Sequence, residues 1–165
     1  MTTAVLGIGS NLGDRRAYLQ SAVDALRPWL SAVSPVYETP PWGPVEQPAY
    51  LNAVLIVTDP TADADTWLDR AHQAEAAAGR TRDVRWGPRT LDVDILSVDE
   101  QIRVDPALTL PHPRAAQRAF VLVPWLAVDP QARLPGAGPL ADLLVRLPVS
   151  EIADVVARPD VALAV

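Results

Sequence analysis

The sequence predicts an α+β domain whose elements follow the order β-α-β-β-α-β. Two apolar runs rich in strand formers, 4–9 and 49–59, indicate buried strands. Apolar residues recur every three or four positions within 14–27 and again within 64–78, which is the period of an amphipathic helix. Residues 90–98 begin by alternating apolar and acidic side chains, as a strand with two unlike faces does. This order is ferredoxin-like, with both helices expected on one face of a mostly antiparallel sheet.

The segment between the first helix and the long central strand contains the expected chain breaks. Residues 31–39 predict another strand, which Pro35 interrupts; a proline in a strand favours a place at the sheet edge. Four prolines and a glycine make 39–48 a stiff loop.

Capping signals and further periodic runs complete the predicted elements. The second helix is expected to begin after a cap at Thr61 or Asp63 and to end at Gly79. Residues 115–129 and 139–146 predict further helices, which form a helical C-terminal extension. No element is predicted beyond them.

Composition limits the class of protein. The 165 residues have the length of one domain, which we expect to extend over 1–165, and 49% of them are apolar, which argues against disorder. No apolar run approaches the roughly 20 residues that span a bilayer. The N-terminal segment has no basic leader and no long apolar stretch, so we expect no signal peptide. The absence of cysteine excludes disulfides and thiolate metal sites. These features together favour a cytoplasmic protein.

The charge pattern indicates which partners the chain binds. A net charge of −6 argues against a general nucleic-acid surface. A small anionic ligand needs only a local group of cations, and all 14 basic residues are arginines. Four of them fall within one short window: Arg80, Arg82, Arg85 and Arg89. We therefore expect small-molecule partners, neither nucleic acid nor membrane, and a monomer, because the proline-rich loops offer no evident apolar patch.

Two aspartates follow this arginine window on the predicted strand. Asp92 and Asp94 are two residues apart, so their side chains share one face about 6.6 Å apart. At an effective dielectric near 20 they repel by about 2.5 kcal/mol, which a divalent cation removes. Oxygen ligands with open positions suit Mg²⁺, and arginines suit the phosphates that complete its shell. The alternative is a solvated strand face on which each aspartate pairs with a nearby arginine.

Several aromatic and amide side chains have two interpretations each. Trp86, in the polar arginine-rich loop, either stacks on a flat heterocycle or anchors the loop against the sheet. Asn52 shares a strand face with Tyr50, and its amide suits the edge of an amide-bearing ring. The alternative for Asn52 is a capped-loop or sheet-edge asparagine. Phe120 is by default a core residue.

The roles of the two histidines and of one glutamate are also undecided. His72 and Glu75 lie three residues apart on the polar side of the second helix, where the default is solvation. His112 stands between two prolines and is either a structural hydrogen-bonding residue or a phosphate contact. GIGSNLG (7–13) joins a strand to a helix but lacks the lysine and spacing of a P-loop, so it predicts a tight turn with polar caps.

Three longer stretches resemble a known family. They are ETPPWGPVEQPAYLNAV (38–54), GRTRDVRWGPRTLDVDIL (79–96) and LPHPRAAQRAFVLVP (110–124), with GSNLGD near the N-terminus. Together they resemble the 6-hydroxymethyl-7,8-dihydropterin pyrophosphokinases of folate biosynthesis, over residues 3 to 146. The family fold is the ferredoxin-like one with extra C-terminal helices.

The resemblance implies an activity and a role for each matching residue. ATP would donate its terminal diphosphate to the 6-hydroxymethyl oxygen of the reduced pterin, and AMP would leave. The catalytic residues would be Arg82, Arg89, Asp92 and Asp94, of which the two aspartates match the ligands of two Mg²⁺ ions. The pterin pocket is matched by Gly9, Thr39, Pro40, Trp42, Tyr50, Asn52, Trp86 and Phe120. ATP phosphates would be bound by Arg82, Arg85, Arg89, His112 and Arg118. The base and ribose would be bordered by His72, Glu75, Ile95, Leu108 and Thr109.

The chain also departs from the family pattern. The 80–89 loop is shorter than in many relatives and lacks the lysine often found there, and Trp42 replaces a frequent leucine. Two other classes of function remain as alternatives. One is a non-catalytic ligand-binding module, because fold does not fix function. The other is a Mg²⁺-dependent phosphohydrolase that uses water in place of the pterin alcohol.

Overall fold

One antiparallel sheet organises the chain in the computed structural model, which describes residues 1–41, 43–79 and 90–165. Its strand order is β5-β1-β4-β3-β8, and β2 also pairs with β4. Since β2 and β3 together occupy the place of one strand, this order is the ferredoxin-like one that the sequence predicts. The strands are β1 (Thr2–Ser10), β2 (Leu30–Val33), β3 (Tyr37–Thr39), β4 (Tyr50–Asp59), β5 (Asp92–Val98) and β8 (Val156–Ala157).

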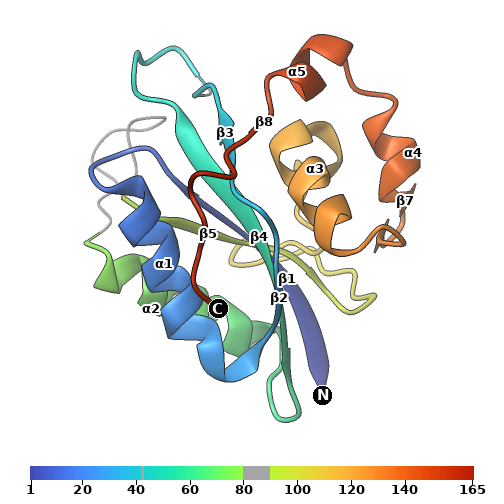
Figure 1. Cartoon of the computed structure of the whole chain (residues 1–165). Helices are drawn as coiled ribbons and strands as arrows, with labels where there is room; N and C mark the ends of the chain where they lie inside the picture. Colours follow the sequence, from blue (N-terminus) through green and yellow to red (C-terminus); the bar gives the residue numbers. More distant parts are fainter. Residues whose placement is uncertain (42, 80–89) are drawn as a thin grey trace.

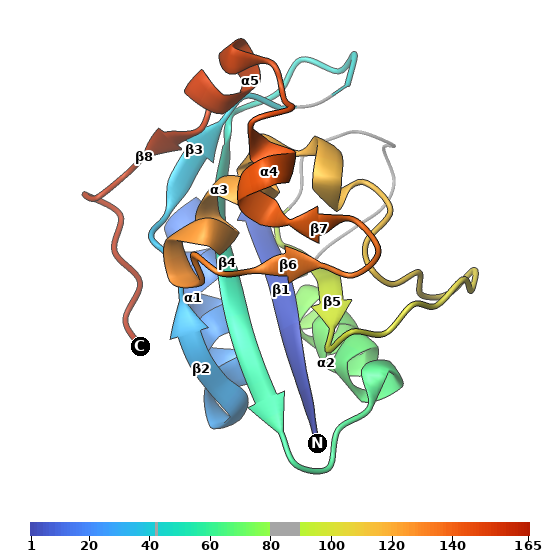
Figure 2. The ribbon, with the colours of Figure 1, turned by 90° about the vertical axis from the view of Figure 1, so that its right-hand side faces the viewer.

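Helices cover both faces of this sheet, in two groups. Helices α1 (Arg15–Leu26) and α2 (Ala64–Ala77) lie on one face, as expected, and α3 (Ala119–Val128) and α4 (Leu140–Leu144) cover the other (Figure 1, Figure 2). The helical extension is therefore the second layer that closes the sheet. The remaining short elements are η1 (Arg27–Trp29), η2 (Ala115–Gln117), β6 (Arg133–Leu134), β7 (Gly138–Pro139) and α5 (Val149–Ala153).

Each face of the sheet has its own apolar core. Strand alternation sends Leu6 and Leu55 toward α1 and α2, and Val54 and Leu96 toward α3. Trp67 of α2 is fully buried in the first core, and its indole Nε1 donates to Oγ1 of Thr2 at 2.8 Å. The sheet is thus buried on both sides. Polar residues are uncommon on a buried face, so those on the α3 face indicate a site.

The predicted breaks are confirmed, with two refinements. Asp63, not Thr61, caps α2, because its carboxylate accepts the Thr66 N–H at 2.8 Å. Gly79 follows the helix with φ +70°, as a C-terminal glycine does. Residues 31–39 split into β2 and β3 on either side of Pro35. Only β2 has the expected edge position, because β8 covers the free side of β3.

The predicted C-terminal helices are also shorter than their periodicity suggests. Residues 115–129 divide into η2 and α3, because Arg118 between them has an extended backbone with ψ 105°. Helix α4 occupies the middle of the predicted 139–146 segment. Helices among the described residues are too short or too polar to pass through a bilayer.

Replacement of Trp67 tests the first core. We expect Trp67→Ala to lower the free energy of unfolding by about 3 to 5 kcal/mol, because it empties a fully buried site. Thr2→Val, which leaves the indole N–H without its partner, should cost about 1 to 3 kcal/mol. Urea unfolding followed by circular dichroism measures both; a loss below about 1 kcal/mol for Trp67→Ala contradicts this packing.

Candidate active site

A cavity of about 240 Å³ lies on the α3 face of the sheet. Strands β1, β3, β4 and β5 form its floor, and α3 with the segment before it forms its wall. The lining combines glycines, an amide, hydroxyls, two carboxylates, a histidine, an arginine and an aromatic ring. These residues are Gly7, Gly9, Thr39, Tyr50, Asn52, Asp92, Asp94, His112, Arg118 and Phe120, with Ile8, Ala53, Val54, Leu96 and Val121 between them.

Two glycines of β1 keep the floor open. Gly9 is paired with Asn52 of β4 on one side and with Asp92 of β5 on the other. A Cβ at Gly9 would lie 2.9 Å from Oδ1 of Asn52, so any side chain at this position would force the Asn52 amide to move. Gly7 stands between Val54 and Asp94 in the same way. The cavity therefore has an amide end on β4 and an acidic end on β5, separated by a bare strand.

The amide end is a small hydrogen-bonded unit. Asn52 is only 6% exposed, and its Nδ2 donates to Oγ1 of Thr39 at 2.7 Å. Thr39 pairs with Tyr50 in the β3–β4 register, so the three side chains share the cavity face. Asn52 lies on a central strand, which removes the sheet-edge alternative for this residue.

The acidic end consists of Asp92 and Asp94, partly exposed on the cavity face of β5. Val93 between them points to the opposite core. Within 1–41, 43–79 and 90–165, no group of three or more His, Cys, Asp or Glu side chains could hold a metal ion. Two carboxylates alone suit a cation that takes its other ligands from water and phosphate, which is the habit of Mg²⁺.

Glu75 of α2 contacts the backbone of β5 from the face opposite the cavity. The expectation that this residue is solvated is wrong: it is 5% exposed, and its Oε2 accepts the Val93 N–H at 2.9 Å. The physical reason is that β5 is an edge strand, whose outer N–H groups need partners other than a strand. A sequence signal existed, since Glu75 is four residues after buried Ala71 and so falls in the apolar stripe of α2. His72 is exposed, as expected.

His112 and Arg118 bring polar groups to the cavity from the wall. The His112 N–H donates to the Leu96 carbonyl at 2.9 Å, and its ring Nδ1 accepts the Arg114 N–H at 3.1 Å. Burial, together with the charges of Arg118 and Arg114, lowers the pKa of His112 to about 4. The ring is therefore neutral at pH 7, and with Nδ1 accepting, its proton is assigned to Nε2.

Arg118 keeps its positive charge beside the acidic end. Burial lowers the pKa of its guanidinium, while the nearby carboxylates of Asp94 and Asp92 raise it. The same guanidinium lies 5.4 Å from the centroid of the Phe120 ring, within reach of a cation–π interaction. Phe120 is half-buried and lines the cavity, so it contributes to the site as well as to the core.

Some of the predicted site residues line the main cavity, and others lie elsewhere in the structure. Lining residues from the prediction are Gly9, Thr39, Tyr50, Asn52, Asp92, Asp94, His112, Arg118 and Phe120. Pro40 instead lines a second cavity of about 150 Å³, which shares Thr39 and Phe120 with the first. Ile95 and Leu108 are buried in the core on the α1–α2 side, and Thr109 donates to the Asp105 carbonyl. Outside the described residues lie Trp42, Arg82, Arg85, Trp86 and Arg89.

Some lining residues were missed by the sequence reasoning. Gly7 and Leu96 line the cavity because each lies two residues from a predicted site residue on the same strand, Gly9 and Asp94. Strand alternation was therefore a usable signal. No sequence signal pointed to Val121, near the start of α3. The break between η2 and α3 sets which side of the helix faces the sheet, and the sequence did not predict this break.

The fold and the cavity together define an α+β domain with a small-molecule pocket. A carboxylate pair and an amide lie in this pocket on either side of a strand that carries glycines. A family model described as 7,8-dihydro-6-hydroxymethylpterin-pyrophosphokinase (HPPK) matches residues 5–130. The chain belongs to this family.

Two bacterial relatives agree with the family. The 2-amino-4-hydroxy-6-hydroxymethyldihydropteridine pyrophosphokinase of Mycobacterium leprae is 57% identical over 148 residues, covering 84% of this chain and 78% of that protein. The protein of the same name from Pseudomonas aeruginosa is 42% identical over 151 residues, covering 89% and 93%.

Among solved structures, wild-type Plasmodium falciparum HPPK-DHPS matches with a TM-score of 0.66 and 13% identity, over 88% of this chain. This chain spans 44% of that one, and at such identity the likeness concerns the fold alone.

The buried histidine gives a prediction for pH. In a His72→Gln variant, which leaves one histidine, the His112 ring signals should titrate with a midpoint near pH 4 by NMR. Because the ordinary histidine value is 6.5, the unfolded chain takes up this proton first, so stability should fall as the pH drops from 6.5 to about 4. A midpoint near 6.5 contradicts the burial of this ring.

Proposed function

We propose that the pterin binds at the amide end of the cavity and Mg²⁺-ATP at the acidic end. The chain then transfers the terminal diphosphate of ATP to the hydroxymethyl oxygen of 6-hydroxymethyl-7,8-dihydropterin and releases AMP. This is the pyrophosphokinase reaction of its family, a step of folate biosynthesis. The observation that carries the proposal is the single row Asn52–Gly9–Asp92 across three strands, which holds an amide and a carboxylate a fixed distance apart.

The amide end suits a pterin. The ring edge of a pterin carries an amide and an amino group, which are the partners that an asparagine side chain recognises. Asn52 is held by Thr39, so its orientation is fixed before the ligand arrives. Phe120 offers a ring face for stacking, and Tyr50 completes this end. Gly9, Pro40, Trp42 and Trp86 belong to the same proposed pocket.

The acidic end suits a triphosphate with its metal. Asp92 and Asp94 would hold Mg²⁺, two ions being expected, whose charge offsets that of the phosphates. Arg118 supplies a fixed positive charge beside them. His112 binds as a neutral donor through Nε2 and cannot serve as a base at neutral pH through Nδ1, which is occupied. Further phosphate contacts are proposed for Arg82, Arg85 and Arg89. The positions proposed to border the base and ribose are His72, Glu75, Ile95, Leu108 and Thr109, although the side chains of Glu75, Ile95 and Leu108 are buried on the other face of the sheet.

The proposed chemistry depends on the relative positions of the two substrates. A bond forms from the hydroxymethyl oxygen to the β-phosphorus, and the bond from that phosphorus to the α-phosphate oxygen breaks. AMP leaves with the electron pair, and the hydroxyl proton passes to solvent. Such a displacement needs positioning and charge neutralisation more than covalent help. The rigid floor of the cavity supplies the positioning. The proposal includes a monomer in the cytoplasm, where ATP is available.

Phosphorus NMR tests the proposed function. With Mg²⁺-ATP and 6-hydroxymethyl-7,8-dihydropterin, we expect AMP and a pterin diphosphate, and neither without the pterin. AMP and pyrophosphate without pterin would indicate a phosphohydrolase, and an unchanged spectrum from folded protein would indicate a binding module; each contradicts the proposal. Asp94→Ala should abolish turnover and leave the circular dichroism spectrum unchanged, since this side chain is partly exposed in the cavity.

Gly9→Ala tests the bare floor. Its new Cβ would lie 2.9 Å from Oδ1 of Asn52 and 3.4 Å from Cδ1 of Tyr50, so the amide end must shift. We expect calorimetry to show pterin affinity weakened by about tenfold or more. Gly7→Ala is the matched control, because the three atoms nearest to its Cβ all belong to the Leu96 side chain, at 3.6 to 3.8 Å, so it should move no polar group. Equal pterin affinity in Gly9→Ala and wild type would contradict the assignment of this end.

A further inference from the structure

The segment 155–165 forms a strap along the edge of the sheet, and it follows the residues that the family model matches. Strand β8 pairs with β3, and the Arg158 N–H donates to the Val36 carbonyl at 2.9 Å. The chain then runs beside α1, from which Arg16 and Gln20 hold its last residues (Figure 1). Val161 and Leu163 pack against the first core. The strap is therefore fastened at two places, β3 and α1.

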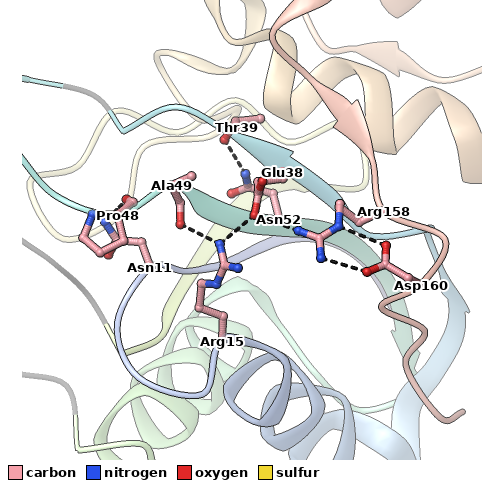
Figure 3. A network of polar contacts seen from close by, with 9 residues as sticks. All are labelled: Asn11, Arg15, Glu38, Thr39, Pro48, Ala49, Asn52, Arg158 and Asp160. Atoms are coloured by element: carbon pink, nitrogen blue, oxygen red, sulfur yellow. Dashed lines mark hydrogen bonds and ion pairs between the residues drawn. The ribbon is translucent and has the colours of Figure 1, made fainter.

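Its fastening at β3 is an ion-pair network centred on Glu38 (Figure 3). One oxygen of Glu38, Oε2, accepts from Nη1 of Arg15 and from Nη1 of Arg158, each at 2.8 Å. Arg158 is itself held by a fork to Asp160, with distances of 2.9 and 2.8 Å. The side chains of Glu38, Arg15 and Arg158 are about one-third exposed, so their contacts are partly shielded from water.

This network touches the backbone of the amide end at two points. Glu38 is paired with Leu51 and faces α1, so the next residue, Thr39, faces the cavity and holds Asn52. Arg15 also donates to the Ala49 carbonyl at 3.0 Å, just before Tyr50. The residues on both sides of the β3–β4 pair are thereby fixed, whereas the aspartates of the acidic end lie on β5, on the far side of β1.

A second feature connects the C-terminal segment to the same end. The smaller cavity beside the first is lined by Glu151, Asp154 and Val155 on one side. On its other side lie Thr39 and Phe120, which it shares with the first cavity. The segment that leads into the strap therefore lines a cavity that borders the main one at Thr39 and Phe120.

We propose that Glu38, Arg15 and Arg158 are positioning residues for the pterin, and that the strap sets pterin affinity without affecting ATP. The proposal rests on the proposed function for the identity of the ligand at the amide end. Loss of the Arg158 side chain removes one of the two arginines that hold Glu38, which loosens β3 and, through Thr39, the Asn52 amide.

Steady-state kinetics of Arg158→Ala test this. We expect the KM for the pterin to rise about three- to tenfold, with kcat and the KM for ATP within about twofold of wild type. The backbone contact of residue 158 to Val36 remains in this variant, so the strap stays paired. Arg158→Lys, which keeps a cation for Glu38 but not the fork to Asp160, should restore most of the pterin KM.

Arg16→Ala is the matched control, because it releases the strap from α1 at Ala162 and leaves Glu38 untouched. It removes one exposed hydrogen bond, so it should lower the melting temperature no more than Arg158→Ala does, and it should leave the pterin KM unchanged. A pterin KM that rises equally in both variants, or a KM for ATP that rises with it, overturns the proposal.

A ligand-free measurement separates this inference from the proposed function. In ¹H–¹⁵N NMR spectra, Arg158→Ala should shift the Asn52 side-chain amide signals and Arg16→Ala should not. If the wild-type protein transfers no pyrophosphate, the proposed function is wrong. If the Asn52 signals do not shift in Arg158→Ala, the positioning role is wrong.

Discussion

The pairing of β1 with β4 on one side and β5 on the other is the constraint on which the site depends. It fixes Asn52, Gly9 and Asp92 in one row across the sheet. The spacing of the row follows from strand geometry, about 4.8 Å per strand, and no side chain has to maintain it. Both faces of the sheet are packed by helices, so the row cannot bend away. The glycine in the middle leaves the space that a ligand needs.

The two ends of this row are stabilised by different parts of the chain. Glu75 of α2 holds the backbone between the two aspartates, and Glu38, with arginines from α1 and the strap, holds the backbone beside Asn52. Each carboxylate acts behind the sheet, on the face away from the cavity. The polar groups that face the cavity are thus positioned by polar groups on the other face of the sheet, which is the arrangement that a catalytic site on a rigid scaffold requires.

Much of the fold was predictable because its signals are local. The periods of β1, α1, β4 and α2 and the caps at Asp63 and Gly79 each lie within a few residues. The features that escaped prediction depend on partners far away in the chain. Glu75 is buried because an edge strand needs an acceptor 18 residues later, and β8 is too short to have a period. Strand alternation placed the carboxylate pair and Asn52 on one face of the sheet, and it puts Ile95 on the other. Pro40 lines no part of the main cavity because the loop path after β3 decides its position.

A crystal structure of the chain with Mg²⁺, 6-hydroxymethyl-7,8-dihydropterin and α,β-methylene-ATP tests the central claim most directly. The analogue cannot be cleaved at the reacting bond, so both ligands stay in place. The account predicts the pterin edge on Asn52 with its ring against Phe120, and the triphosphate with its metal on Asp92 and Asp94. A pterin outside the cavity, or a triphosphate at the Asn52 end, would contradict it.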